Sequence, residues 1–241
     1  MEGNMQVRMI NAGSGGLRSV FLFFVVILTP HTLLANAGAD PSINAPYRHN
    51  KAQVDDWVQR FERPGREVYD KREQIVATLR LKPGMHIADV GAGTGLYTRL
   101  FVPKVGSKGR VYAVDISKPF IDAIKKQAKS HGWNNVIGIV NNNTSTRLPK
   151  NSIDLVFVCD TYHHFEAPDK MLASIRRALK SGGRLVIIDF RKDPKVSSPW
   201  IFSHVRATRL QVIKEVRAAG YILVKNHGLL QHNYFLEFKR P

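Results

Sequence analysis

Residues 87–98, IADVGAGTGLYT, join an apolar run to three glycines at alternate positions and then to a segment with helical periodicity. This order predicts a β-strand, a tight turn and an α-helix. Glycine is needed in such a turn because it adopts backbone angles that side chains forbid and lets a ligand lie against bare backbone. The stretch therefore predicts a ligand site at the carboxyl end of a strand.

The spacing of the glycines narrows the class of ligand. Gly91, Gly93 and Gly95 do not form the Gly-x-Gly-x-x-Gly of dinucleotide folds, and no Gly-Lys-Ser/Thr follows to hold a triphosphate. A second apolar run ends in Asp115, which is placed to accept the two hydroxyls of a ribose. A nucleoside without a pyrophosphate is therefore favoured over the alternative that the glycines only make a turn.

The segments 89–95 (DVGAGTG) and Val114-Asp115 resemble the first two signature motifs of class I S-adenosylmethionine-dependent methyltransferases. The resemblance runs from about Glu67 to the C-terminus and implies S-adenosylmethionine as the cofactor. It implies that Asp89 holds the ammonium group, that the glycines approach the ribose and methionine part, and that Ile116 packs on adenine. The expected cofactor contacts are Asp89, Gly91, Ala92, Gly93, Gly95, Asp115, Ile116, Asn142, Asn143, Thr144 and Cys159.

The end of the third expected strand departs from the family pattern. Many relatives carry an acidic residue there that binds the adenine amino group, whereas this chain offers Asn142, Asn143 and Thr144 before the Leu148-Pro149 pair. An amide oxygen can still accept a hydrogen bond from an amine. We therefore expect adenine to be bound without a carboxylate.

Length and composition predict one globular domain. The chain has 241 residues, of which 44% are hydrophobic and 23% charged, and a formal net charge of +17. Its basic residues are dispersed over several expected helices, without a block of five or six like charges. Solvated helix faces are therefore favoured, and a nucleic-acid partner stays an alternative. The single cysteine, Cys159, excludes an internal disulfide.

The N-terminus carries the pattern of a secretory signal peptide. Arg8 and Arg18 precede the apolar run 20–28, and an Ala-x-Ala pattern ends at Ala37. We expect cleavage after Ala37 and an exported protein, or, without cleavage, a membrane anchor that is the only membrane contact. The expected organisation is residues 1–37 as signal peptide or anchor, 38–65 as linker and N-terminal helix, and 66–241 as methyltransferase domain.

Alternating strand and helix patterns predict a Rossmann-like, doubly wound α/β fold with helices on both faces of a mostly parallel sheet. The expected strands are 85–90, 109–114, 136–141, 155–159, 184–189, 222–226 and 232–239. The expected helices after the glycine turn are 96–105, 119–131, 168–180 and 203–219, and two helices, near 54–61 and 66–79, precede it. The closing hairpin resembles the antiparallel last strand of the methyltransferase sheet.

The segment 160–165, DTYHHF, follows the fourth expected strand, where ligands of open α/β sheets gather. Asp160, His163 and His164 are the candidate catalytic residues: a histidine takes a proton from the acceptor, and Asp160 orients it or the acceptor. The alternative is that the histidines only bind loop carbonyls. These residues include one carboxylate and no further clear metal ligand, so we expect no metal site.

The long loop after the fifth expected strand supplies the candidate substrate contacts. They are Trp200, His204 and Arg206, together with Tyr162. For Arg206 the alternative is an exposed side chain at a helix start. The sequence predicts a methyltransferase for a small-molecule O or N acceptor. The alternatives are a basic RNA-binding methyltransferase and a non-catalytic S-adenosylmethionine-binding module.

Overall fold

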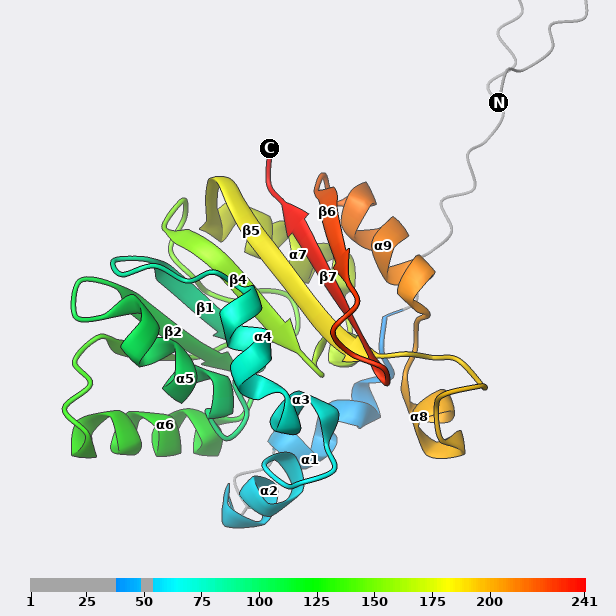
Figure 1. Ribbon diagram of the computed structural model, residues 1–241, viewed down its shortest axis with the longest axis horizontal. Coiled ribbons are helices and arrows are strands. Elements are labelled where there is room, and N and C mark those ends of the chain that lie inside the picture. Colours follow the sequence, from blue (N-terminus) through cyan, green and yellow to red (C-terminus); the bar gives the residue numbers. More distant parts are fainter. Residues whose placement is uncertain (1–37, 49–53) are drawn as a thin grey trace, which may run out of the picture. The chain divides into compact units, whose positions relative to one another are not determined.

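A seven-stranded sheet lies at the centre of the computed structural model, which describes residues 38–48 and 54–241 (Figure 1). The strand order is β3-β2-β1-β4-β5-β7-β6, and β7 alone runs opposite to the other six strands, so its pairings with β5 and β6 are antiparallel. The strands are β1 (His86–Val90), β2 (Arg110–Asp115), β3 (Val136–Val140), β4 (Ile153–Cys159), β5 (Leu179–Phe190), β6 (Ile222–His227) and β7 (Asn233–Lys239). The expected Rossmann-like fold with an antiparallel last strand is confirmed.

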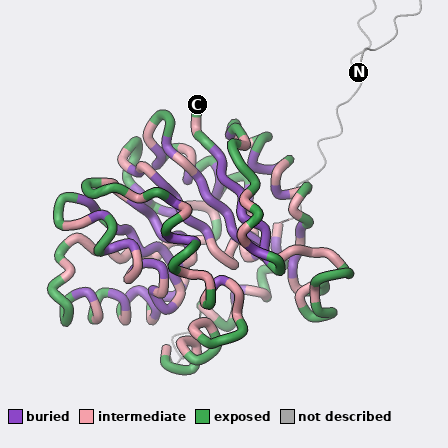
Figure 2. Tube along the Cα trace, in the orientation of Figure 1, coloured by how far each residue is buried: buried purple, intermediate pink, exposed green. Residues whose placement is uncertain are grey.

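Helices cover both faces of the sheet because successive strand residues point to opposite sides. Ile87 of β1 packs with the side chains of α4 (Arg72–Thr78) and α5 (Leu96–Val105), whereas Ala88 and Val90 belong to the core shared with α7 (Pro168–Ala178) and α9 (Arg209–Ala218). Helix α6 (Lys118–Ser130) packs on Ala113, on the α5 side. In Figure 2 the inner strands β1, β2, β4, β5 and β7 are mostly buried between these layers, whereas β3 is half-buried and β6 is largely exposed.

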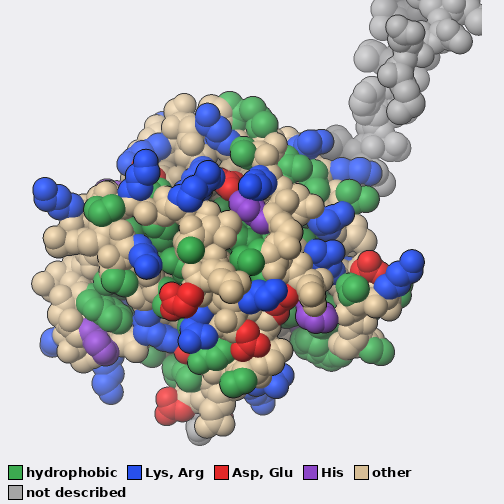
Figure 3. Space-filling view, viewed as in Figure 1, with side chains coloured by type: hydrophobic (Ala, Val, Ile, Leu, Met, Phe, Trp, Pro, Cys, Tyr) green, Lys and Arg blue, Asp and Glu red, His purple; other side chains and the backbone are tan. Residues whose placement is uncertain are grey.

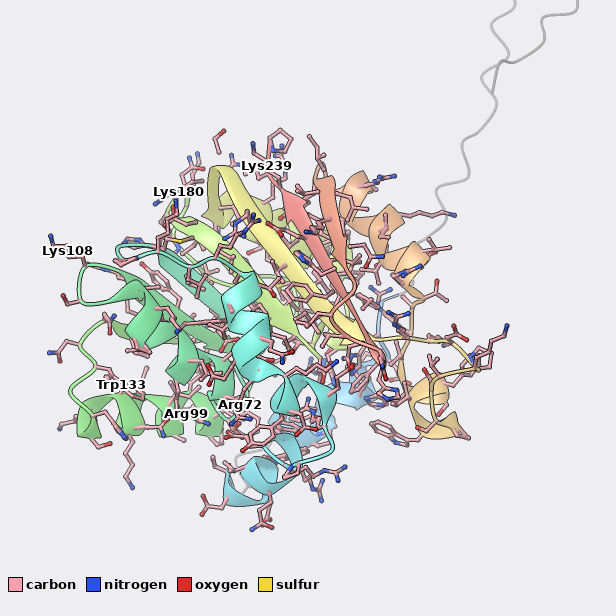
Figure 4. All side chains as sticks on the ribbon, in the orientation of Figure 1. Arg72, Arg99, Lys108, Trp133, Lys180 and Lys239 are labelled. Carbon is pink, nitrogen blue, oxygen red and sulfur yellow. The ribbon has the colours of Figure 1, made fainter. Side chains whose placement is uncertain are left out.

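Short helices gather beyond the carboxyl ends of β1 and β4, where the strand order reverses (Figure 1). They are η1 (Pro41–Asn44), α1 (Ala45–Arg48), α2 (Val54–Phe61), α3 (Glu67–Asp70), η2 (Tyr162–His164) and α8 (Pro199–His204). Three of the basic side chains lie at the opposite end of the sheet, where the parallel strands begin: Lys108, Lys180 and Lys239 (Figure 4). Lysine and arginine are scattered over the face that Figure 3 shows.

Several expected elements differ from the structure. The helix expected near 66–79 is interrupted at Lys71, between α3 and α4, and β5 begins at Leu179 rather than near 184. The segment expected as a linker is helical from Pro41 to Arg48, and the Ala39 amide donates a hydrogen bond of 2.9 Å to the Phe165 carbonyl.

The single helix expected over 203–219 is wrong: α8 ends at His204 and α9 begins at Arg209. Val205 between them is extended and buried, and the Thr208 hydroxyl caps α9.

The expected signal peptide, residues 1–37, lies outside the described residues. Among residues 38–48 and 54–241, no helix has the length and apolar character needed to cross a membrane.

Candidate active site

A cavity of about 1090 Å³ opens beyond the carboxyl ends of the central strands. The glycine turn after β1 and the end of β2 form one side, and the η2 loop and α8 form another. Residues of η1, α1, α2 and α3 complete the lining. Segments that lie more than 100 residues apart in the chain therefore enclose one space, large enough for a nucleoside and a second small molecule.

The glycine turn brings bare backbone to this cavity. Gly91 and Gly93 have left-handed φ angles of 76° and 52°. A Cβ on Gly91 would lie 2.2 Å from the Thr161 hydroxyl oxygen, whereas one on Gly93 would approach only the Phe61 ring, at 3.5 Å. Both glycines and Ala92, which are among the expected cofactor contacts, line the cavity. The turn therefore leaves room for a ligand at Gly93.

Gly95 differs from the two glycines before it. It does not line the cavity, but stands at the start of α5 with a φ of 83°. A Cβ there would lie 2.8 Å from the Ile124 side chain of α6. Gly95 is therefore needed for the close approach of α5 and α6, and the prediction that it contacts the cofactor is not supported by its position.

Asp115, at the end of β2, is held by backbone donors. Its two carboxylate oxygens each accept a hydrogen bond of 2.8 Å, from the Gly93 and Ser117 amides. Burial raises the pKa of Asp115 to about 6, against these hydrogen bonds. Each oxygen has a second lone pair, so the carboxylate can still accept the hydroxyls of a ribose. This geometry fits the predicted role.

Asp89 is a second buried carboxylate at the cavity. The Thr98 hydroxyl donates to one of its oxygens at 2.7 Å. Burial raises the pKa of Asp89 to about 7, with a further contribution from the negative charge of Asp115. A cationic ligand group beside it would favour the ionised form. Asp89 is therefore suited to the ammonium group that the family resemblance assigns to it.

The residues that follow β3 are not arranged as expected for binding adenine. The Asn142 side-chain oxygen accepts hydrogen bonds from the Thr144 amide and hydroxyl, both 3.1 Å, and from the Ser145 amide, 2.8 Å. Thr144 does not line the cavity, and the side-chain nitrogen of Asn143 donates a hydrogen bond to the Glu166 carboxylate. The oxygen proposed for adenine is thus used within its own turn.

Asn141 supplies the acceptor that the neighbouring residues lack. Its side-chain oxygen is buried, and no hydrogen-bond donor reaches it among the described residues. Asn141 lines the cavity, and its backbone N–H donates a hydrogen bond of 3.0 Å to the Asp115 carbonyl. An unpaired buried acceptor is costly, and an adenine amino group beside Asp115 and Ile116 would satisfy it. The residues present therefore fit an adenosine.

Cys159 and Asp160 follow on β4. Cys159 lines the cavity, and burial raises the pKa of its thiol well above the ordinary value, so it is no nucleophile. Asp160 has a left-handed φ of 45°, and its carboxylate binds Arg66 at 2.7 Å and Asn233 at 2.6 Å. These partners hold a strained residue in place. The expected pairing of Asp160 with a histidine is not observed.

Three histidines meet where η2 and α8 line the cavity. His163 Nδ1 lies 2.7 Å from an oxygen of Asp189, whose other oxygen accepts the His163 amide at 2.9 Å. His164 Nδ1 lies 3.1 Å from the side-chain oxygen of Asn44. The ring of His204 lies 5.1 Å from that of His163 and 5.6 Å from that of His164, between centroids.

This environment favours neutral rings at His164 and His204. Burial, together with the positive charge of a protonated His163, lowers the pKa of His164 to about 3. Burial also lowers the pKa of His204. Burial alone would raise the pKa of Asp189, but the His163 ring and the hydrogen bonds from His163 and Phe190 outweigh it, so the pKa is lowered. Asp189 is therefore an anion beside these rings.

The expected substrate contacts separate into two groups. Trp200 and His204 line the cavity and stack at 4.5 Å with an interplanar angle of 17°. Tyr162 and Arg206 lie outside the lining and bind Glu215: the Tyr162 hydroxyl donates at 2.7 Å and the Arg206 guanidinium at 2.6 and 2.9 Å. Their placement does not support substrate binding, since this buried cluster fastens α9 to the η2 loop.

Sequence reasoning missed three residues of the site: Asn44, Asn141 and Asp189. Asp189 closes the fifth expected strand, and an acid at a strand's carboxyl end is a usable signal. Asn141 directly precedes the residues that were chosen. Asn44 has no local signal, because it lies 120 residues from His164. The expectation of no metal site rested on the lack of a further ligand, and His204 now stands beside the other two histidines.

Comparisons with known proteins agree with this geometry. Residues 88–187 match the sequence profile of a family described as Methyltransferase domain. The chain is 32% identical over 113 residues to the ubiquinone/menaquinone biosynthesis C-methyltransferase UbiE of Hydrogenovibrio crunogenus, covering 46% of this chain and 44% of the relative. The UbiE protein of Pseudoalteromonas translucida is 30% identical over 122 residues, or 50% and 49%. The chain spans about half the length of these curated relatives.

Solved structures extend the similarity to the whole fold. A SAM-dependent methyltransferase from Aquifex aeolicus has a TM-score of 0.69 at 25% identity, covering 77% of this chain and 98% of that one. The [4+2]-cyclase SpnF has a TM-score of 0.61 at 16% identity, covering 71% and 80%. The fold alone therefore does not fix the reaction, which depends on the residues of the cavity.

Proposed function

We propose that this protein, a member of the class I S-adenosylmethionine-dependent methyltransferases, transfers a methyl group to a small-molecule acceptor held beside His163, His164 and His204. One observation carries the proposal: the glycine turn with Asp115 and the three histidines line the same cavity. The first set suits an adenosine, and the second can exchange protons with a neighbouring molecule.

Different residues of the cavity bind different parts of the cofactor in this proposal. Asp115 accepts hydrogen bonds from the ribose, Asp89 faces the ammonium group, and Asn141 accepts from the adenine amine. Gly93 leaves the space in which the ligand approaches the backbone. When bound, the cofactor supplies a methyl carbon made electrophilic by the neighbouring sulfonium. What remains for the protein is mainly to align the acceptor and to manage its proton.

His163 is the residue best placed to take that proton. Asp189 is ionised and accepts only, so the hydrogen bond of 2.7 Å places the proton of the neutral ring on Nδ1. Nε2 then keeps a lone pair and can accept a proton from an acceptor hydroxyl or amine. Asp189 also stabilises the imidazolium that forms. Asp160 is a positioning residue in this proposal, through Arg66 and Asn233.

A second candidate is methyl transfer to carbon. The relatives' names speak of C-methylation in quinone biosynthesis, and the cavity lining includes Phe190 and Trp200 next to the histidines. Removal of a proton from a phenol raises the electron density on its oxygen and on the adjacent ring carbons. The same histidine therefore serves an oxygen or a carbon acceptor, and a flat ring suits the aromatic lining.

The test is to incubate the purified protein with S-adenosylmethionine and a panel of phenols, amines and thiols, and to measure S-adenosylhomocysteine and methylated product by mass spectrometry. Product with at least one acceptor supports the proposal, and the methylated atom separates the two candidates. Tight cofactor binding without product over the panel favours a binding module. Binding to RNA that weakens steeply with salt favours a nucleic-acid acceptor.

A further inference from the structure

We propose that His163, His164 and His204 bind a divalent transition-metal ion, with zinc as the representative, at the acceptor end of the cavity. One ring nitrogen of each histidine lies within 4.8 Å of the other two. Three protein ligands and one open position are the arrangement of catalytic zinc sites, and a set of three histidines is one of its forms. Nothing in the family resemblance or the comparisons assigns this site.

The outer partners of two rings are already those of metal ligands. A histidine that binds a metal usually donates its other ring N–H to a carboxylate or carbonyl oxygen, which fixes the tautomer. His163 has such a partner in Asp189, at 2.7 Å, and His164 has one in the Asn44 oxygen, at 3.1 Å. The nitrogen left on each ring is Nε2, with its lone pair.

The orientation of Asn44 is fixed independently. Its amide nitrogen donates to the His164 carbonyl at 3.0 Å and to the Glu166 carboxylate at 2.7 Å. Both partners are acceptors, so the oxygen of the amide must be the atom that faces His164 Nδ1. His163 is almost fully buried, at 3% exposure. Two of the three rings are thus held with a defined tautomer before any ion binds.

The upper limit on the distances between the histidine ring nitrogens is slightly longer than the distances around a bound zinc ion. Zinc–nitrogen bonds of about 2.0–2.1 Å in a tetrahedral site place the nitrogens roughly 3.3 Å apart. The limit of 4.8 Å, which holds for one nitrogen of each ring, exceeds this spacing by about 1.5 Å. His204 stands on the six-residue helix α8 and is half-buried, so its side chain can supply much of the movement needed.

Three neutral imidazoles would leave the ion its full double charge and an open position in the cavity. An acceptor hydroxyl or thiol that binds there through its oxygen or sulfur has a lowered pKa and loses its proton to water. With the ion bound, His163 is no longer needed as the proton acceptor. This role rests on the proposed function, whereas binding of the ion does not depend on methyl transfer.

The experiment is calorimetric titration of zinc into the full chain after chelator treatment. His204→Ala is the test variant, because the ring is only half-buried and stands on a short helix, and thermal unfolding shows whether the loss of its stacking on Trp200 matters. His131→Ala is the matched control, since His131 is exposed at the end of α6 and does not line the cavity. Cobalt in place of zinc reports tetrahedral nitrogen coordination by its visible spectrum. S-adenosylhomocysteine binding and thermal unfolding are measured on the same samples.

We expect one zinc ion per chain in the wild type and in the control, and at least about 100-fold weaker binding in His204→Ala. Asp189→Asn, which alters an outer partner, is expected to weaken binding by about 10- to 100-fold. Equal binding to the wild type and His204→Ala, or no binding to the wild type, overturns the site. Zinc binding without methyl transfer would overturn only the proposed function, and methyl transfer without zinc binding only this inference.

Discussion

Replacement of Asp115 by alanine tests the cofactor end of the cavity. The wild-type carboxylate has a free lone pair on each oxygen beyond those used by Gly93 and Ser117. Two hydrogen bonds from a ribose to an ionised carboxylate contribute about 1.5–3 kcal/mol each, before the partial replacement by water. We therefore expect a loss of about 2–4 kcal/mol, or roughly 30- to 1000-fold in Kd.

The measurement is calorimetric titration with S-adenosylhomocysteine, which is not consumed, at a pH near 8. The pKa of Asp115 is about 6, so the carboxylate is ionised there. Asp122→Ala is the matched control: it removes an exposed carboxylate of α6 that pairs with Lys118 at 2.5 Å, and it should leave Kd unchanged. If Asp115→Ala binds as tightly as this control while remaining folded, the assignment of the ribose to Asp115 is refuted.

Four further predictions concern other parts of the chain. The affinity for S-adenosylhomocysteine should rise as the pH increases from 6 to 8, because the pKa of Asp89 is about 7 and a bound ammonium group favours its ionised form; a titration series that is flat over this range contradicts it. His163→Asn, whose amide can replace the Nδ1 donor, should lower kcat by about 10²- to 10⁴-fold with little change in the Kd for S-adenosylhomocysteine, and an equal loss of both points to a structural role. Gly91→Ala should reduce the free energy of unfolding in urea by roughly 2 kcal/mol or more, since it adds a collision to a left-handed φ, whereas Gly65→Ala, with open space around it, should cost only the backbone part. Sequencing the N-terminus of the protein recovered from its native host should show a chain that begins directly after Ala37, and an intact first segment argues for an anchor.

The fold was predictable because its signals are local. The strand, turn and helix around Gly91 are encoded within twelve residues, and each later strand is an apolar run closed by turn residues. The break between α8 and α9 was missed, although Thr208 followed by Gln211 has the Ser/Thr-x-x-Glu/Gln spacing of a capping box. The expected helix was drawn from the spacing of apolar residues alone, and this spacing does not mark where a helix begins.

The candidate site was predictable only where a residue follows its strand directly. Asp89, Asp115 and the histidine pair were found in this way. The contacts of His163 with Asp189 and of His164 with Asn44 join segments 26 and 120 residues apart, and they depend on sheet order and on the packing of η1. A single sequence contains the residues, but not their pairing.

The packing of the first described residues has a practical consequence for anyone who produces this protein. The place of a Cβ at Gly38 is taken by the Glu166 carbonyl, only 1.7 Å away, and Asn44 a few residues later orients one of the histidines. Gly38 must therefore stay a glycine when an affinity tag is joined ahead of it, because a side chain there would push on the loop that follows His163 and His164. A shortened version limited to residues 88–187 would keep His163 and His164 but lose Asn44, Asp189 and His204 around them.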